Sequence, residues 1–285
     1  TYTTQRNRHR RITDMAFCTL FDANYTAQGL ALLRSIYRHH GAASVVVVLA
    51  MDNDTAGRIR GVGVGATPIV VTLDQMPPLY HQRAAGRSVA ERCWMATPFL
   101  CDWTYETYGS ATYLDADCFL FARIPYLDKA ECQIVPHNLD KIHHKRLAHN
   151  GTYNVGYIHF GHCKSSRSAL NCWLYRTVSW RESPEQPRFN DQLFLEDWPK
   201  KFDAVVLKDP GLNIAPYNQL QRDVKETETG TTVDGHPLLM YHFHEWEVGD
   251  DGKPARGGYA LQWAAKHYIY KRYEQEIGAC IAPMT

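Results

Sequence analysis

The chain of 285 residues carries a formal net charge of +1 and is 45% hydrophobic and 12% aromatic. The near-neutral charge argues against a dedicated nucleic-acid-binding protein, which would carry a basic excess. No apolar run approaches the roughly 18 residues of a membrane-spanning helix, so the composition predicts a water-exposed chain with a substantial core.

Hydrophobic periodicity predicts alternating strands and helices in the first half of the chain. The β-branched run at 44–51 is typical of a buried parallel strand, and Leu30, Leu33 and Ile36 share one face of a helix. Further strands are predicted at 14–21, 67–73 and 111–121, and a further helix at 90–108. This alternation implies an α/β fold with a mostly parallel central sheet.

The second half mixes shorter elements and contains no internal repeat. Strands are predicted at 133–136, 154–160, 204–207 and 237–243, and helices at 166–180, just after residue 190 and at 259–277. The segment 248–258 is rich in Gly and Asp, so we expect a mobile loop that could close over a ligand.

Eight cysteines are scattered along the chain and form no C-x-x-C pair. Cys18, Cys101 and Cys118 lie inside apolar segments, which is typical of reduced core thiols and not of a disulfide framework or zinc site. The first residues are polar and basic and do not resemble a secretory signal, so we expect a cytoplasmic protein. The basic cluster at 6–11 fits a solvated terminus or, alternatively, peripheral contact with an anionic membrane.

Two carboxylates interrupt the apolar segment 111–121. Asp115 and Asp117 are one residue apart, so an extended backbone would point both to the same side. Like charges this close are costly to desolvate unless a cation lies between them. A divalent metal that also grips a diphosphate is the usual reason for such a site. The alternative is a turn with two solvated Asp residues.

Polar residues also follow the first two predicted strands. Asp22 comes directly after strand 14–21, and Asp52 comes just beyond strand 44–51. Because ligands collect beyond the carboxyl ends of strands in sheets of this kind, we expect Asp22, Asp52 and the pair of carboxylates to converge on one crevice.

Six segments in order, spread over nearly the whole chain, resemble the GT-A glycosyltransferases of the type that includes glycogenin and the lipopolysaccharide galactosyltransferases, and within it a poorly characterised bacterial branch. They are FDANYTAQGLALLRS, ERCWMATPFL, TYLDADCFLF, NGTYNVGYIHF, FNDQLFLEDWP and LLMYHFHEW. The resemblance implies a GT-A, Rossmann-like α/β fold with a smaller mixed C-terminal part, in one domain over 1–285. Residues 14–121 would form the nucleotide-binding half and 122–285 the acceptor and sugar half.

The resemblance implies that Asp115, Asp117 and His242 hold a divalent cation, Mn²⁺ or Mg²⁺, against a nucleotide diphosphate. An imidazole beside carboxylates suits manganese. The alternative for His242 is a core histidine fixed by hydrogen bonds. His244 competes for the ligand role, because both side chains point the same way on a strand.

The family's nucleotide site includes the turn after the first strand. The corresponding residues here are Leu20, Phe21, Asp22, Tyr25, Asp52 and Ala116. Tyr25 could stack on a pyrimidine, and the resemblance makes uridine the preferred base. Helix capping is the alternative role for Asp22 and Asp52.

The family's Asn-x-Gly corresponds to Asn154 and Gly156, which would line the sugar pocket. A Gly inside a strand is then explained by close approach of a ligand. Arg87, with Arg92 as the alternative, would lie near the donor phosphates, and His244 would also face the donor. A solvated helix charge is the alternative for either arginine.

Asp191 and Gln192 match the family's block beside the sugar face. In a retaining reaction, which the resemblance favours, either could stabilise an oxocarbenium-like transition state. In an inverting reaction Asp191 would be the general base, and helix capping is the alternative role. The implied partners are a nucleotide-sugar donor and a glycan or lipid-linked acceptor in bacterial polysaccharide synthesis.

One departure from the family pattern concerns the diphosphate. Glycogenin-like members continue from the histidine through a Gly to Lys-Pro-Trp, whereas His242 is followed by FHEWE and Lys253 comes later. The donor sugar and the stereochemistry therefore stay open. A dehalogenase-type phosphatase wants Thr or Val where Phe119 stands, and a nucleotidyltransferase would carry a Gly-rich phosphate loop. The alternative from another class is a non-catalytic, sugar-nucleotide-binding scaffold with the same fold.

Overall fold

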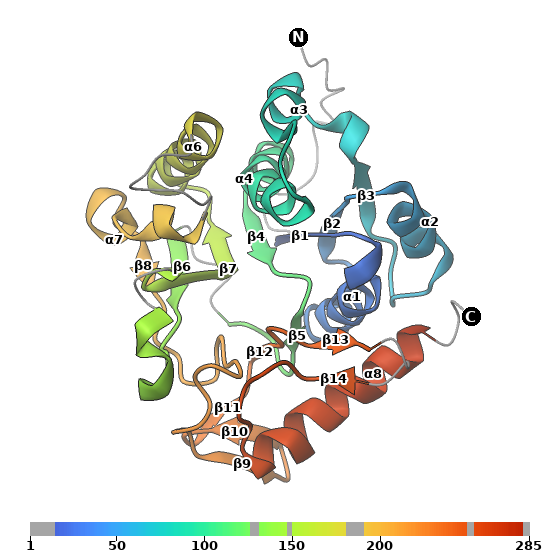
Figure 1. The fold of residues 1–285 in the computed structure, drawn as a ribbon, viewed down its shortest axis with the longest axis vertical. Coiled ribbons are helices and arrows are strands. Elements are labelled where there is room, and N and C mark those ends of the chain that lie inside the picture. The colour runs from blue at the N-terminus through green and yellow to red at the C-terminus, as the bar shows by residue number, and fades with distance from the viewer. Residues whose placement is uncertain (1–14, 126–130, 147–149, 181–190, 250–253, 282–285) are drawn as a thin grey trace.

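The computed structural model describes residues 15–125, 131–146, 150–180, 191–249 and 254–281. Its centre is a seven-stranded sheet in the order β3-β2-β1-β4-β7-β6-β8 (Figure 1). The strands are β1 (Ala16–Phe21), β2 (Val45–Ala50), β3 (Ile69–Thr72), β4 (Ala111–Leu114), β6 (Cys132–Pro136), β7 (Tyr153–Phe160) and β8 (Val205–Val206). All neighbours run parallel except β7, which is antiparallel to β4 and β6. The predicted α/β fold class is confirmed.

Side-chain alternation along β1 builds a separate core on each face of the sheet. Phe17 and Phe21 belong to one buried cluster, whereas Cys18 and Leu20 belong to the other. Every residue of β2 is buried, as expected for a strand covered on both faces. The two cores hold the carboxyl ends of β1, β2 and β4 in fixed positions at one edge.

Helices cover both faces. One core includes side chains of α1 (Thr26–His40), α2 (Asn53–Gly61) and α8 (Lys271–Ile281), and the other includes those of α3 (Pro78–Ala84), α4 (Val89–Tyr108) and α6 (Lys164–Ser179) (Figure 1). A capping box between Ser88 and Glu91 starts α4, and Gly109 ends it in the left-handed region at a φ of 84°. None of the described helices combines the length and apolar composition needed to cross a membrane.

The second half adds small antiparallel units below the main sheet in Figure 1. β5 (Cys118–Leu120) pairs with β12 (Met240–His242), and β13 (Glu247–Val248) pairs with β14 (Pro254–Ala255). A three-stranded sheet contains β9 (Val224–Thr227), β10 (Gly230–Val233) and β11 (His236–Pro237). The short helix α7 (Trp198–Lys201) precedes β8.

Three sequence expectations differ from the structure. The strand predicted at 237–243 is two strands, β11 and β12, with an irregular step at Leu238 and Leu239. The helix predicted from 259 begins later, as a π-helical segment at Ala265–Tyr270 that continues into α8. In the irregular segment before it, the carbonyl of Ala260 accepts a hydrogen bond from the side chain of Gln219. The helices α2 and α3 were not predicted.

His40 gives the fold a specific acid sensitivity. Its Nε2 accepts the backbone N–H of Ile124 at 3.2 Å, and burial, with the nearby charge of Arg123, lowers the pKa of the ring to about 4. The unfolded chain binds a proton at this histidine near its ordinary pKa of 6.5, whereas the folded chain does not until about pH 4. The contribution of the His40 ring to folding stability is therefore fully present above pH 6.5 and is lost as the pH falls towards 4.

We expect His40→Gln to reduce the loss of stability between pH 7 and pH 5 by on the order of 1 kcal/mol, after allowing for solvent screening of a partly exposed ring. A Gln oxygen can accept the same N–H but does not titrate. Urea unfolding at both pH values measures this effect. His81→Gln, at an exposed position, is the control, and an equal gain from it would contradict the assignment.

Candidate active site

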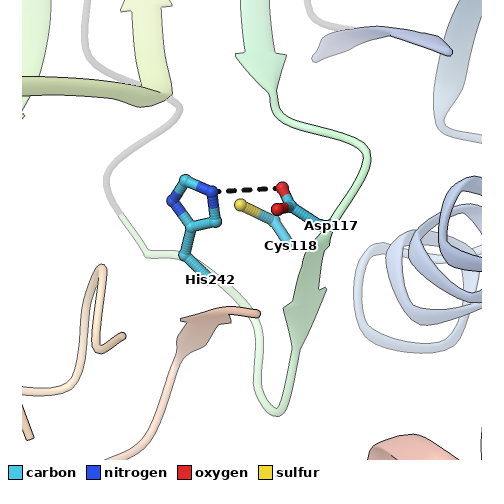
Figure 2. Close-up of side chains that lie close together, drawn as sticks. All are labelled: Asp117, Cys118 and His242. Carbon is cyan, nitrogen blue, oxygen red and sulfur yellow. Dashed lines mark ion pairs between the residues drawn. The ribbon is translucent and has the colours of Figure 1, made fainter. Parts of the chain in front are cut away.

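The three predicted metal ligands meet where two strands pair. Asp115 follows β4, Asp117 precedes β5, and His242 is the last residue of β12. The antiparallel register places His242 opposite Cys118, and the N–H of Phe243 donates to the carbonyl of Asp117 at 2.8 Å. Backbone pairing therefore holds the imidazole beside the carboxylate of Asp117 (Figure 2).

The side chains are close enough to share one cation. Nε2 of His242 lies 3.1 Å from Oδ1 of Asp117 and 3.8 Å from Oδ2 of Asp115. Residues 115–117 do not form the extended strand expected from the sequence, because the N–H of Cys118 donates to the carbonyl of Asp115 and closes a turn. The turn brings both carboxylates to the same imidazole. The two carboxylates were expected to lie on one side of an extended strand, and in the structure a turn places them together instead.

Burial makes the charges in this group interdependent. Asp117 is 9% exposed and His242 is 3% exposed. Burial, with the charge of Asp117, raises the pKa of Asp115 to about 6 against the opposing effect of His242. Burial also acts to raise the pKa of Asp117 and to lower that of His242, but their mutual attraction reverses both shifts. One buried carboxylate, one partly exposed carboxylate and one imidazole nitrogen fit a Mn²⁺ or Mg²⁺ ion, which would neutralise the excess negative charge.

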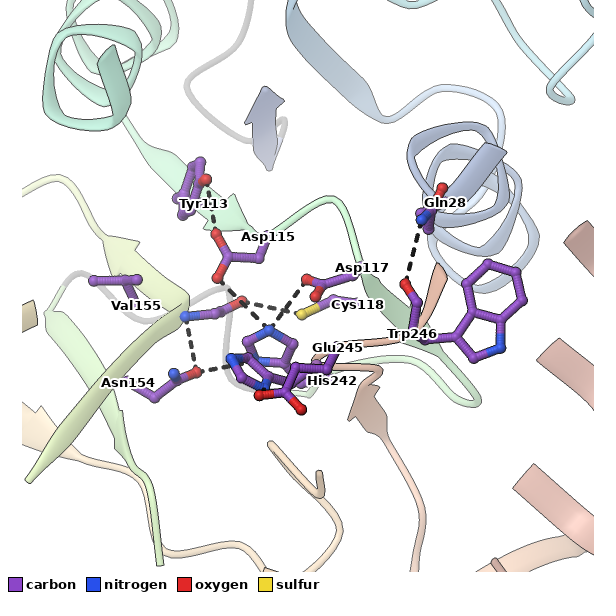
Figure 3. Close-up of polar contacts among 12 residues, drawn as sticks. Gln28, Tyr113, Asp115, Asp117, Cys118, Asn154, Val155, His242, Glu245 and Trp246 are labelled. Atoms are coloured by element: carbon purple, nitrogen blue, oxygen red, sulfur yellow. Dashed lines mark hydrogen bonds and ion pairs between the residues drawn. The ribbon is translucent and has the colours of Figure 1, made fainter. Parts of the chain in front are cut away.

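Asn154 holds the other side of the His242 ring. Its Oδ1 lies 3.2 Å from Nδ1 of His242 and accepts the N–H of Gly156 at 2.9 Å. On the carboxylate side, the hydroxyl of Tyr113 donates to Oδ1 of Asp115 at 2.9 Å. These contacts, drawn in Figure 3, orient the candidate ligands from both sides.

Gly156 is needed for the packing of His242. A Cβ at this position would lie 2.5 Å from Oδ1 of Asn154 and 2.6 Å from Nδ1 of His242. The sequence suggested that this Gly allows a ligand to approach, but in the structure the space above it is taken by the imidazole. Close approach by the proposed ligand residue itself explains the Gly.

We expect Gly156→Ala to weaken Mn²⁺ binding by about 10-fold or more, because the added methyl displaces the ring of His242. The overpacking should also cost about 1 to 3 kcal/mol of stability. Isothermal titration with Mn²⁺ and urea unfolding measure the two effects. Gly63→Ala is the matched control, since a Cβ there meets nothing within 4 Å, and an equal loss of affinity in both variants would refute this role.

Asp191 is a buried carboxyl beside this group. It is 3% exposed, and its Oδ2 has no hydrogen-bond partner among the described residues. Burial, with the charge of Asp115, raises the pKa of Asp191 to about 8. Its side chain makes no capping bond to the 3₁₀ helix at Gln192–Leu195, so helix capping does not explain it.

Gln192 is bound to β7. Its Oε1 accepts Nδ2–H of Asn154 at 2.9 Å and the N–H of Val155 at 3.3 Å. Both acceptor positions of this oxygen are filled. Of the two predicted catalytic residues, Asp191 is the one whose side chain has an oxygen without a described hydrogen-bond partner.

The turn after β1 meets the end of β2 at the same edge. Oδ1 of Asp22 accepts the N–H groups of Asn24 and Tyr25 and caps a 3₁₀ helix at Ala23–Tyr25. Asp52 caps α2 through Thr55 at 2.7 Å, and its other oxygen accepts the N–H of Ala23 at 2.8 Å. Although burial acts in the opposite direction, these amides hold the pKa of Asp52 below its ordinary value. Both carboxylates are thus helix caps, as the alternative reading of the sequence suggested.

Tyr25 faces the proposed metal ligands. It is 37% exposed, and burial, with the charges of Asp117, Glu247, Asp115 and Asp22, raises its pKa to about 12. The remaining predicted nucleotide residues, Leu20, Phe21 and Ala116, are 6%, 2% and 7% exposed. Among the predicted nucleotide residues, Tyr25 is exposed and Asp22 partly exposed, whereas Leu20, Phe21 and Ala116 are buried.

Solved structures share this arrangement of elements. LgtC, solved as an active-site mutant, matches with a TM-score of 0.59 and 14% identity over 93% of this chain and 96% of its own. The glycosyltransferase GlyE of Streptococcus pneumoniae TIGR4 gives 0.54 and 15% identity over 95% and 64%, and the bifunctional glycosyltransferase WbbM gives 0.50 and 15% over 73% and 41%. The chain has the GT-A glycosyltransferase fold. It spans less than two thirds of GlyE and of WbbM, and most of LgtC.

Two curated Bacillus subtilis proteins with sequence similarity to this chain are described as uncharacterised. The uncharacterised Bacillus subtilis strain 168 protein YfnF is 24% identical over 253 residues, which is 82% of each chain. YfnD of the same strain is 23% identical over 238 residues, 80% of this chain and 76% of its own. No family model matches the chain.

The arginines predicted to meet donor phosphates lie at the start of α4 in this GT-A fold. That end of α4 faces the site, since burial and the charges of Asp22 and Asp115 raise the pKa of Cys93 to about 12. Arg87, however, stacks on Trp180 at 4.6 Å and pairs with Glu91 at 3.7 Å. Contact of Arg87, or of Arg92, with a phosphate stays a prediction.

His244 does not join the metal group. Its Nδ1 lies 3.2 Å from the hydroxyl of Tyr259, and its ring centroid is 5.9 Å from that of His242. The predicted lid begins nearby as the hairpin β13–β14 and is anchored by Arg256, which makes two 2.7 Å bonds to Glu274. Lys253 lies outside the described residues.

Three site residues were missed by the sequence interpretation. Cys118, assigned to the core, offers its sulfur within 4.8 Å of ligand atoms of Asp117 and His242 (Figure 2). His137 contacts Asn154 at 3.2 Å. The ring of Tyr217 packs against His137, His242 and His244. Cys118 lies inside the segment TYLDADCFLF but was assigned to the core, whereas His137 and Tyr217 belong to no quoted segment; the register of β5 and β12 places Cys118 opposite His242.

Proposed function

We propose that this chain is a metal-dependent glycosyltransferase that moves a sugar from a nucleotide-diphosphate sugar to an acceptor hydroxyl. The observation that carries the proposal is the convergence of Asp115, Asp117 and Nε2 of His242 at the carboxyl edge of a GT-A sheet. The likeness to proteins titled as glycosyltransferases supports the reaction type. A UDP-sugar is the preferred donor, by resemblance to the family.

The nucleotide-binding half would be residues 14–121 and the sugar and acceptor half residues 122–285. Tyr25 would cover the base and the backbone after β1 would contact the ribose. Asp115, Asp117 and His242 would hold Mn²⁺ or Mg²⁺. A cation at this position supplies a Lewis acid for the negative charge that develops on the leaving diphosphate.

Asp191 would act at the sugar. Its carboxyl, which is buried and makes no helix-capping bond, would face the anomeric carbon. Positive charge developing on that carbon would favour the ionised form of the carboxyl. As the bond from the anomeric carbon to the diphosphate breaks, the acceptor oxygen would attack that carbon with retention of configuration, the course the resemblance favours, and the departing phosphate would take the proton of the acceptor hydroxyl. The acceptor would be a glycan or a lipid-linked glycan in bacterial polysaccharide synthesis.

A reducing compartment fits the cysteines. All eight are free thiols, including Cys18 and Cys101, whose sulfur atoms lie 4.0 Å apart. We therefore place the protein in the cytoplasm. Peripheral contact with the inner membrane face through the basic cluster at 6–11 belongs to the same proposal, although that cluster lies outside the described residues.

A panel of nucleotide-sugars with Mn²⁺ tests the function in two steps. The donor would be the nucleotide-sugar that raises the thermal unfolding temperature only when Mn²⁺ is present. Release of nucleoside diphosphate over time would establish turnover. Stabilisation without slow hydrolysis or transfer would instead indicate a non-catalytic binding scaffold. NMR of the product linkage would distinguish retention from inversion.

A further inference from the structure

Asn154 connects His137 to His242 in the interior. Nδ2 of Asn154 lies 3.2 Å from Nε2 of His137, and its Oδ1 lies 3.2 Å from Nδ1 of His242. The three side chains are between 3% and 4% exposed, so water does not replace these contacts easily. The proposed reaction gives His137 no part.

Two backbone amides fix the orientation of the side chains in this network. The N–H of Gly156 donates to Oδ1 of Asn154 at 2.9 Å, and the N–H of Val155 donates to Oε1 of Gln192 at 3.3 Å. A backbone N–H can only donate, so both partner atoms are oxygens. The amide nitrogen of Asn154 therefore faces His137 and Gln192. The amide oxygen faces His242, as Figure 3 shows.

The proton positions on both rings follow. Because Oδ1 of Asn154 only accepts, Nδ1 of His242 carries a hydrogen, and Nε2 is the nitrogen that faces Asp117 and Asp115. Because Nδ2 of Asn154 only donates, Nε2 of His137 accepts and carries no hydrogen. A neutral ring agrees with its surroundings, since burial, with the charge of His242, lowers the pKa of His137 to about 4.

We propose that His137 is a positioning residue that fixes the ring of His242, through Asn154, in the orientation that presents Nε2 to the two carboxylates. The inference rests on the proposed metal site, because that site gives the orientation its use. His137 and Gln192 accept both hydrogens of Asn154. Loss of the His137 acceptor leaves one buried N–H unsatisfied, which weakens the hold on the amide whose oxygen fixes the ring of His242.

The first test needs neither metal nor substrate. The ¹⁵N shifts of the histidine rings in the metal-free protein, assigned by comparison with His137→Leu, report which nitrogen of His137 is protonated. We expect an unprotonated Nε2 on His137 and a protonated Nδ1 on His242. A proton on Nε2 of His137 would reverse the donor and acceptor and overturn the proposal.

The second test compares Mn²⁺ binding in matched variants, measured by the EPR signal of free Mn²⁺. We expect His137→Leu to bind about 10-fold more weakly, and His137→Gln to recover most of this loss because its amide oxygen can accept from Asn154. His159→Leu is the control, since this buried histidine of β7 bonds Thr112 and not Asn154. In an Asn154→Ala background, His137→Leu should have no further effect.

Equal affinity in wild type and His137→Leu, or an undiminished effect in the Asn154→Ala background, would refute the positioning role. Failure of the proposed function would appear differently, as absence of Mn²⁺ binding in the wild type and in every variant. In that case the ring shifts of His137 and His242 still decide whether the network has the stated direction.

Discussion

Asp117→Ala is expected to abolish Mn²⁺-dependent release of nucleoside diphosphate while the protein stays folded. Asp117 lies 3.1 Å from Nε2 of His242 and is 9% exposed, so its loss would remove the buried carboxylate from the three proposed ligands. A bound cation contributes several kcal/mol to stabilising a leaving diphosphate, so we expect a fall on the order of 10³-fold or more. The rate with the best donor from the panel measures it.

Two controls make this result specific. Asp74→Ala removes an exposed carboxylate near the opposite edge strand β3 and should leave the rate unchanged. Circular dichroism and thermal unfolding should show that Asp117→Ala keeps its secondary structure, because the backbone pairing of β5 with β12 does not use this carboxylate. Full activity of the wild-type protein in excess chelator would refute the metal-dependent mechanism.

The polar residues at the sheet edge could be predicted from the sequence, because the patterns that identify each strand and its end lie within a single segment of the chain. The run at β2 is buried throughout, and its composition alone identifies a covered parallel strand. Asp22 and Asp52 follow such strands, and the structure ties their ends together through the 2.8 Å bond from Ala23 to Asp52. Because parallel strands end at a common edge, alternation of strands and helices was sufficient to predict this convergence.

Contacts that depend on register could not be predicted this way. The opposition of His242 and Cys118 comes from an antiparallel pairing between segments more than a hundred residues apart. The turn at Asp115 and Asp117 replaced an expected extended strand because it is closed by one backbone bond. His137 lies in no motif, and its contact with Asn154 arises where β6 and β7 pair with a register shift near Val135.

Asp191 differs from the other carboxylates at this edge in its hydrogen bonds. Asp22 and Asp52 cap helices, whereas Asp191 makes no capping bond and its Oδ2 is buried without a described hydrogen-bond partner. Burial and the charge of Asp115 outweigh the backbone amides of Asp191 and Gln192, which favour the charged carboxylate. An unsatisfied buried carboxyl costs stability. Its folded pKa of about 8 lies above its ordinary value of 3.8, so the cost is absent at low pH and grows as the pH rises from about 4 to 8.

Asp191→Asn should therefore make the protein more stable and less active. At pH 7 we expect the metal-free variant to gain on the order of 1 to 3 kcal/mol, and to gain little at pH 4, because an amide of the same shape needs no proton to remain neutral. Turnover should fall by about 10² to 10³-fold, since the amide cannot offer negative charge to the oxocarbenium-like transition state. Nucleotide affinity should change little, because the proposed role of Asp191 is at the sugar and not at the β1 turn. Urea unfolding at both pH values, single-turnover kinetics and titration with nucleotide separate the three effects. A near-normal rate combined with the stability gain would show that the buried carboxyl of Asp191 lowers stability and has no role in the reaction.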